Sequence, residues 1–172
     1  ISAQLATVGE AVKIGAVAVG FTIYLGSAHE EEMLEEFERI QREAHKKGLP
    51  VIVWMYPRGA GVKGMSEVEL MAYATRVALE IGADIVKVQP HGNYDDFEWA
   101  AKSAGKVKVV SAGGAKKKES ELYEQVREFI GAGFSGMAIG RNIWQAKDPM
   151  KITKNLKKII WQKEVQGRKK RK

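Results

Sequence analysis

The chain has 172 residues, 45% of them hydrophobic and 28% charged, a composition typical of one globular domain with a sizeable core. It has no cysteine, which excludes disulfides, thiolate metal sites and a cysteine nucleophile, and which fits a reducing, cytoplasmic location. No apolar run is long enough to cross a bilayer, so a membrane partner is not expected.

The formal net charge of +7 is concentrated at the carboxyl end, where residues 168–172 are all basic. We expect a domain over residues 1–162, followed by a solvated basic tail over 163–172. Such a tail attracts nucleic acid electrostatically, but it has no interleaved aromatics for base stacking, so a nucleic-acid partner is not expected. The chain opens on Ile1 rather than Met, and truncation or processing of a longer protein is the simplest explanation.

Helix-like and strand-like segments alternate along the whole chain. After a short helix at 8–14, strands are predicted at 17–24, 51–55, 85–89, 107–110 and 136–139. Longer helices are predicted at 30–47, 66–81, 95–103, 119–131 and 148–162. Local signals agree with this assignment, because Gly48 follows the basic end of one helix and Ser66 with Glu69 forms the pattern of a capping box at the start of the next.

Strands that alternate with helices indicate an α/β fold with a mostly parallel sheet. The pattern leaves open both a doubly wound sheet and a closed (β/α) barrel. No G-x-G-x-x-G sequence follows the first strand, which weakens the dinucleotide-binding version of the open sheet. Five strands are too few for an eight-stranded barrel of about 250 residues, so a barrel interpretation makes this chain only part of one.

Polar or glycine-rich segments follow every predicted strand, at the edge where parallel α/β sheets bind ligands. Side chains alternate between the two faces of a strand, which separates a purely apolar face from a mixed one. We expect the mixed faces to line one interior and to bring together Tyr24, Trp54, Tyr56, Lys87 and Ser111.

Lys87 lies in an apolar strand, where an ammonium group is costly unless it is paired or partly neutralised. Loss of water favours the uncharged amine, which can attack a ketone and form an iminium. The iminium withdraws electrons, so a carbon–carbon bond two atoms away can break, and Tyr56 is the candidate for moving the proton. The alternative is a strand-end lysine that reaches solvent or pairs with a carboxylate, with Trp54 and Tyr56 as core aromatics.

A candidate phosphate cradle follows the fourth and fifth strands. Ser111, Gly113 and Gly114 offer a hydroxyl and backbone N–H groups to an anion, and Gly140 and Arg141 follow the next strand. The last two loops of many barrels form a phosphate site in this way. A Gly-Gly pair on its own is more often only a turn.

The histidines give no sign of a metal site. His29, His45 and His91 share no metal-ligand spacing, so no metal is predicted. His29 and His45 are expected to face solvent from one helix.

At these residues the sequence resembles the archaeal-type class I fructose-1,6-bisphosphate aldolases of the DeoC/FbaB superfamily. The matching segments are GFTIYLGS at 20–27, VWMYPRG at 53–59, GADIVK at 82–87, SAGG at 111–114 and AIGRNIWQ at 138–145. The resemblance runs from about Val8 to Ile160.

The resemblance implies a TIM (β/α)8 barrel of which this chain covers about strands 4 to 8. It implies a Schiff-base mechanism without metal or cofactor, in which fructose 1,6-bisphosphate is reversibly cleaved to dihydroxyacetone phosphate and glyceraldehyde 3-phosphate. Lys87 matches the imine lysine, Tyr56 the proton-transfer tyrosine and Trp54 the tryptophan beside it. The phosphate-binding positions match Ser111, Gly113, Gly114, Gly140 and Arg141. Large homo-oligomers are usual in the family.

The chain also departs from the family. The first three βα units, including a strand that ends in Asp-His-Gly, have no counterpart here, and an incomplete barrel would seek a complementary chain for its open edges. Residues 89–92, Gln-Pro-His-Gly, replace the usual Tyr-Thr-Gly. Two alternatives therefore stand beside the aldolase: a related transaldolase-type enzyme of aromatic precursor synthesis, and an inactive barrel fragment that acts as an assembly module.

Overall fold

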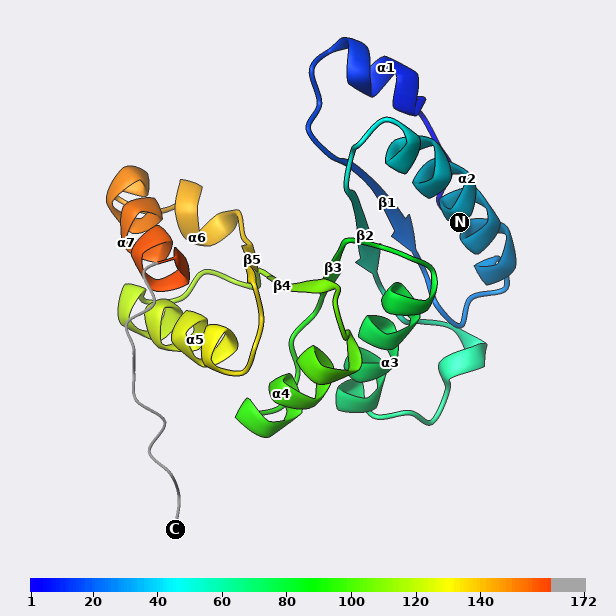
Figure 1. The fold of residues 1–172 in the computed structure, drawn as a ribbon. Helices are drawn as coiled ribbons and strands as arrows, with labels where there is room; N and C mark the ends of the chain where they lie inside the picture. The colour runs from blue at the N-terminus through cyan, green and yellow to red at the C-terminus, as the bar shows by residue number, and fades with distance from the viewer. Residues whose placement is uncertain (162–172) are drawn as a thin grey trace.

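The computed structural model describes residues 1–161, so the predicted tail over 163–172 lies outside the described residues. Five strands form one sheet: β1 Val19–Ile23, β2 Val51–Met55, β3 Ile85–Val88, β4 Lys108–Ala112 and β5 Gly136–Ala138. The helices are α1 Val8–Lys13, α2 Glu30–Lys46, α3 Glu67–Glu80, α4 Tyr94–Ser103, α5 Glu119–Gly131, α6 Arg141–Trp144 and α7 Pro149–Trp161. The prediction of an α/β fold is confirmed (Figure 1).

The structure contains two short elements and one strand extension that the sequence did not predict. Two short elements were not predicted, the 3₁₀ turn η1 Ala60–Val62 and the four-residue helix α6, because neither is long enough to show a hydrophobic period. Strand β4 continues to Ala112, so Ser111 lies inside the strand rather than after it.

None of the helices within residues 1–161 is long and apolar enough to cross a membrane.

The order of the strands distinguishes between the doubly wound sheet and the (β/α) barrel, the two arrangements that the sequence left open. The five strands are all parallel, and each lies beside the one before it, in the order β1-β2-β3-β4-β5. Because crossovers between parallel strands are right-handed, adding strands always on the same side puts every helix on the same face. A doubly wound sheet instead reverses its strand order at one point. The sheet is therefore single-sided, as in a (β/α) barrel, and Figure 1 shows α2, α3, α4 and α5 following one another around it.

The main core lies between the sheet and its helices. In β2, Val51, Val53 and Met55 are fully buried, whereas Ile52 and Trp54 between them are partly exposed. At the other end of this core, the rings of Phe97, Phe129 and Phe134 pack with centroids 4.8 to 6.1 Å apart. A smaller cluster joins α5 to α7 through Leu122, Val126, Ile152 and Leu156.

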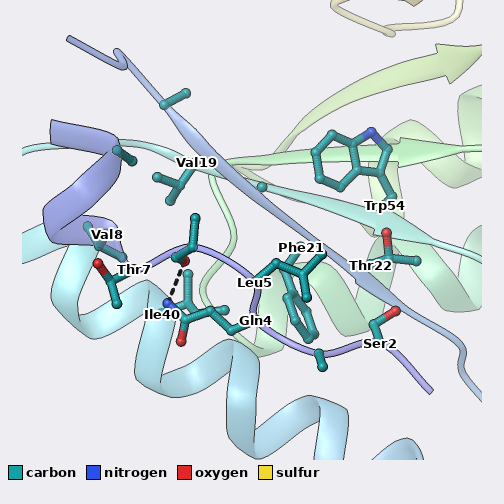
Figure 2. Close-up of a pocket in the computed structure, with 15 residues that line it drawn as sticks. Ser2, Gln4, Leu5, Thr7, Val8, Val19, Phe21, Thr22, Ile40 and Trp54 are labelled. Carbon is teal, nitrogen blue, oxygen red and sulfur yellow. Dashed lines mark hydrogen bonds between the residues drawn. The ribbon is translucent and has the colours of Figure 1, made fainter. Parts of the chain in front are cut away.

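Strand β1 is an open edge of the sheet. Within residues 1–161 it pairs only with β2. A cavity of about 480 Å³ lies between this strand and the first eight residues. Figure 2 shows the segment that carries Gln4 and Leu5 running beside β1, with Trp54 across the strand from it. Large apolar side chains near this edge are uncovered: Leu5 is 99% exposed and Val17 is 82% exposed.

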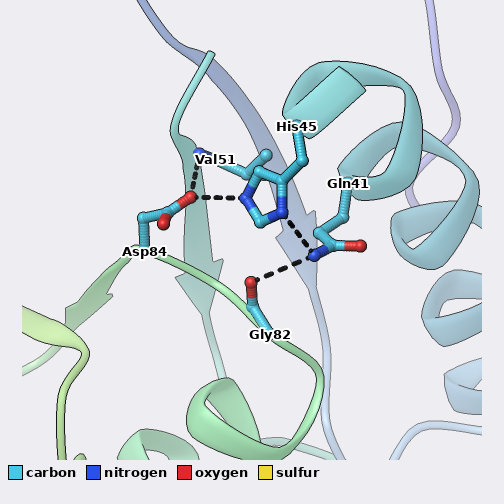
Figure 3. Close-up of polar contacts among 5 residues, drawn as sticks. All are labelled: Gln41, His45, Val51, Gly82 and Asp84. Carbon is cyan, nitrogen blue, oxygen red and sulfur yellow. Dashed lines mark hydrogen bonds and ion pairs between the residues drawn. The ribbon is translucent and has the colours of Figure 1, made fainter. Parts of the chain in front are cut away.

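Asp84, the residue before β3, joins the amino ends of β2 and β3 (Figure 3). One oxygen of its carboxylate accepts the Val51 backbone N–H at 2.8 Å and lies 2.8 Å from His45 Nε2. The other ring nitrogen of His45 lies 2.8 Å from Gln41 Nε2. The exposed side chain of His45 confirms the prediction that this residue faces solvent, and its contact with Asp84, 39 residues away, is one that the helix period does not reveal.

The environment of Asp84 holds its pKa below the usual value. Burial is the largest single effect and acts to raise the pKa, but the hydrogen bonds from Val51 and His45, with the positive charges of His45 and Lys106, together outweigh it. A lowered pKa means that the folded state favours the carboxylate, so its contribution is present above the unfolded-state pKa of about 3.9 and is lost as pH falls through the folded-state value.

Asp84→Asn is therefore expected to lower the free energy of unfolding by about 1–2 kcal/mol at pH 7, because it weakens two hydrogen bonds to a charged group. Urea denaturation measures this loss, and the difference from the unsubstituted chain should shrink as the pH is lowered towards 3. In a double-mutant cycle with His45→Gln, the two losses should not add, since the residues share one contact. Equal losses at pH 3 and pH 7 would contradict the assignment.

Candidate functional site

Lys87 and Trp54 lie side by side on the face of the sheet that the helices leave uncovered. The register pairs Trp54 with Lys87 across β2 and β3, and Lys87 with Val110 across β3 and β4. Both side chains are partly exposed, while Val86 and Val88 on the other face of β3 are buried. Within residues 1–161 no carboxylate lies within 4.0 Å of the Lys87 ammonium group, so the alternative in which Lys87 pairs with a carboxylate is not what the structure contains.

A glycine makes room for Trp54. A Cβ atom on Gly20 of β1 would lie 2.2 Å from Trp54 Cη2, so the indole covers the backbone of the neighbouring strand at that point. Trp54 also lines the cavity beside β1, whereas Lys87 does not. Trp54 therefore lies next to both the edge cavity and Lys87.

Two tyrosines and an arginine form a stack at the carboxyl ends of β1 and β2. The ring centroids of Tyr24 and Tyr56 are 6.2 Å apart. The guanidinium carbon of Arg58 lies 4.6 Å from the Tyr24 centroid and 5.5 Å from that of Tyr56, within the range of a cation–π contact. The sequence pattern assigned no role to Arg58, and its place beside both phenols depends on β1 and β2 being neighbours.

The backbone holds this stack in place. The pairing of β1 with β2 continues past the strands, because Tyr56 N–H donates to Ile23 O at 2.9 Å and Arg58 N–H donates to Leu25 O at 2.7 Å. The chain then turns at Gly59, which has φ of 112° and whose missing Cβ would lie 2.5 Å from Gly26 O. Only glycine fits this conformation and this close approach.

Ser111 does not share the face of Lys87, which corrects the predicted grouping. Ser111 is in register with Val88, is fully buried on the helix-covered side, and its hydroxyl donates to Ala112 O at 3.1 Å. Because β4 extends to Ala112, the side chains still alternate between the two faces at its end, and Ser111 points to the same face as the buried Val109.

The two predicted phosphate loops lie next to each other at the ends of β4 and β5. Gly113 N–H donates to Ala138 O at 2.9 Å and so continues the pairing of the strands. A Cβ on Gly113 would lie 2.8 Å from the side chain of Ile139 and 3.0 Å from its Cα, whereas a Cβ on Gly114 would meet nothing within 4 Å. Gly140 caps the short helix α6, and Arg141 begins it with an exposed side chain.

Asn142 joins these two loops and was missed as a separate functional candidate. It is 5% exposed, its Oδ1 accepts the Lys117 N–H at 2.7 Å, and its Nδ2 donates to Ala115 O at 3.1 Å. Nothing in the sequence indicates that its partners are 25 and 27 residues away. Among residues 1–161 no group of three potential metal ligands is gathered in one place.

Comparison with known proteins identifies the family. The sequence model of the DeoC/LacD family of aldolases matches residues 2–146. The class 1 fructose-bisphosphate aldolase of Thermoproteus tenax is 46% identical over 162 residues, which are 94% of this chain and 62% of that protein. The chain belongs to the DeoC/LacD family, and the resemblance to archaeal class I fructose-1,6-bisphosphate aldolases is confirmed.

Solved structures agree with this assignment. An archaeal fructose 1,6-bisphosphate aldolase is 46% identical and superposes with a TM-score of 0.86, covering 93% of this chain and 64% of that one. A further archaeal aldolase, 45% identical with the same TM-score and coverage, was solved with its catalytic lysine bound to the carbinolamine intermediate of its substrate. The chain thus spans less than two thirds of the length of these relatives.

The two adjacent glycines provide a matched test of the loop geometry. Gly113→Ala is expected to lower the free energy of unfolding by about 1–3 kcal/mol, because the new methyl group must displace Ile139, including its backbone. Gly114→Ala points into open space and should change the stability by less than about 0.5 kcal/mol. Denaturant unfolding of both variants measures the difference, and equal stabilities would contradict the packing of Gly113 on Ile139.

Proposed function

We propose that this chain carries the Schiff-base half of a class I fructose-1,6-bisphosphate aldolase, with Lys87 as the imine-forming lysine. The observation that carries the proposal is the position of Lys87: it stands beside Trp54 on the uncovered face, without a carboxylate partner in the described chain. The names of the relatives, including one with an intermediate bound to its lysine, support the same reaction.

The chemistry follows from the amine. The uncharged Lys87 Nζ attacks the C2 ketone of fructose 1,6-bisphosphate, and loss of water from the carbinolamine gives an iminium. The C4 hydroxyl then loses its proton, the C3–C4 bond breaks, and its electron pair enters the enamine as glyceraldehyde 3-phosphate leaves. Protonation of C3 and hydrolysis of the imine release dihydroxyacetone phosphate and free Lys87. We assign the proton transfers to Tyr56 and the shaping of the pocket to Trp54.

The charges on either side of Lys87 fit a substrate with two phosphates. On one side, the loops after β4 and β5 offer the Gly114 N–H, Gly140 and the exposed Arg141, while Gly113 contributes its lack of a side chain. On the other side, Arg58 presents its N–H donors from the tyrosine stack. With its hydroxyl turned to the helices, Ser111 is proposed to act through its backbone alone.

We further propose that β1 to β5 are strands 4 to 8 of an eight-stranded barrel. The share of the relatives' length that this chain spans, the open edge of β1 and the exposed side chains of Leu5 and Val17 support this assignment. The missing strands would come from further residues of a longer protein or from a complementary chain. Homo-oligomers and a cytoplasmic location, usual for such enzymes, belong to the same proposal.

A second candidate is an inactive barrel part that serves assembly only. The uncovered edge of β1 favours it, because a strand edge with apolar neighbours is a ready template for another chain. The imine chemistry distinguishes the two functions, since an assembly module needs no reactive lysine.

Borohydride trapping with dihydroxyacetone phosphate tests the aldolase. Reduction of the imine should leave a stable adduct on Lys87, located by peptide mass spectrometry. Lys87→Arg keeps a cation on the strand but cannot form an imine, so labelling should fall by at least about a hundredfold, the scale of losing a nucleophile. Cleavage of fructose 1,6-bisphosphate then separates this enzyme from the transaldolase-type alternative.

Lys106→Arg is the matched control, because Lys106 is an exposed lysine before β4 and its replacement should leave the labelling unchanged. An adduct that persists in Lys87→Arg would assign the chemistry to another amine. A folded chain that gives no adduct would favour the assembly module.

A further inference from the structure

We propose that Asn142 is a positioning residue that makes one anion cradle out of the two loops after β4 and β5. The inference rests on the proposed function, because it assigns to this cradle the phosphate group of the ketose phosphate that reacts with Lys87. Asn142 does not itself touch the substrate in this proposal. It acts by fixing the positions of Gly114 and Arg141 relative to each other.

The first loop, residues 113–118, needs an outside partner to be ordered. It has no helix or strand of its own, and two of its backbone groups, Ala115 O and Lys117 N–H, bond to the Asn142 side chain of α6. The side chain of Asn142 bonds to the carbonyl of Ala115 and to the N–H of Lys117, the pattern that a neighbouring strand would otherwise provide. Lys116 adds a contact in the same direction, since its Nζ donates to Gln145 O at 2.5 Å.

Burial makes the Asn142 contacts effective. At 5% exposure, the Asn142 amide has little water to replace its partners, and removing it takes away the two hydrogen bonds by which α6 holds the exposed residues Ala115 and Lys117. Lys116, by contrast, is exposed, and water competes with its single bond. Asn142 is therefore the principal tie between the loops.

The tie lies directly beside the groups that would hold the anion. Gly114 immediately precedes Ala115, and Arg141 immediately precedes Asn142, so each donor is one residue away from one end of the tie. A cradle made from two loops binds an anion well only if its donors are already in position, because ordering them on binding opposes the affinity. Loss of the tie should weaken the binding of phosphate and leave the imine chemistry of Lys87 unaffected.

Two ketones separate these effects in the borohydride assay. Dihydroxyacetone phosphate requires both the lysine and the cradle, whereas dihydroxyacetone requires only the lysine. In Asn142→Ala, the concentration of dihydroxyacetone phosphate that gives half-maximal labelling of Lys87 should rise about tenfold or more. The corresponding concentration of dihydroxyacetone should stay within about twofold.

Asn142→Asp is the second variant. Its carboxylate can still accept the Lys117 N–H, but it cannot donate to Ala115 O and it adds a negative charge beside the cradle, so the loss should be at least as large. Asn155→Ala is the control. Asn155, on α7, donates its Nδ2 to the Tyr123 hydroxyl of α5 at 3.1 Å and not to either loop, so neither ketone should be affected.

Unchanged half-maximal concentrations in both Asn142 variants would overturn the proposal, and so would an equal loss for the two ketones, which indicates general damage to the fold. If neither ketone labels Lys87 in the unsubstituted chain, the proposed function fails and the binding of inorganic phosphate decides the role of Asn142. A phosphorus NMR titration should then give a weaker affinity for Asn142→Ala than for Asn155→Ala, and equal affinities would overturn the inference.

Discussion

The right-handed geometry of the connections between parallel strands is the constraint on which the rest of this structure depends. Five strands added in sequence order, with right-handed connections, force every connecting helix onto the same face of the sheet. That face becomes the core, and its inward positions, such as Val53 and Val86, are fully buried. The other face receives no helix, so it alone can hold a lysine with access to a ligand. The location of Lys87 is thus a consequence of connectivity before it is one of chemistry.

The two ends of the same strands serve different purposes. At the amino end of β3, Asp84 N–H donates to Val51 O and Asp84 O accepts from Lys108 N–H, so both neighbouring strands are fixed beside β3. The carboxylate of Asp84 adds the tie to helix α2 through His45. Three residues further along, Lys87 inherits this register and meets Trp54 on one side. The polar contacts at the amino ends therefore help to set the strand register that continues to the carboxyl ends.

The sequence predicts the repeating parts of this structure well and the contacts between repeats poorly. Alternation and capping patterns locate the strands and long helices, because those signals are local. The motif around Lys87 identifies the family, and strand alternation correctly places Trp54 on the face of the lysine. The predicted face of Ser111 was wrong because the predicted strand ended at residue 110, whereas β4 extends to Ala112. The contacts of His45 and Asn142 join segments more than twenty residues apart, which no local pattern contains.

The uncovered face links the proposed chemistry of Lys87 to the proposed closure of the sheet at β1. An imine-forming amine works best where water is scarce, since solvent favours the charged ammonium. Trp54 lies beside Lys87, but Lys87 remains partly exposed within the described chain. Closing the sheet at the open edge of β1 would bring further strands across from Lys87 and remove that water. Closure of the sheet would also bury Leu5 and Val17. Leaving a large aliphatic side chain exposed costs about 1.5–3 kcal/mol relative to burying it. The hydrophobic surface at the edge thus provides a driving force for the closure that the proposed role of Lys87 requires.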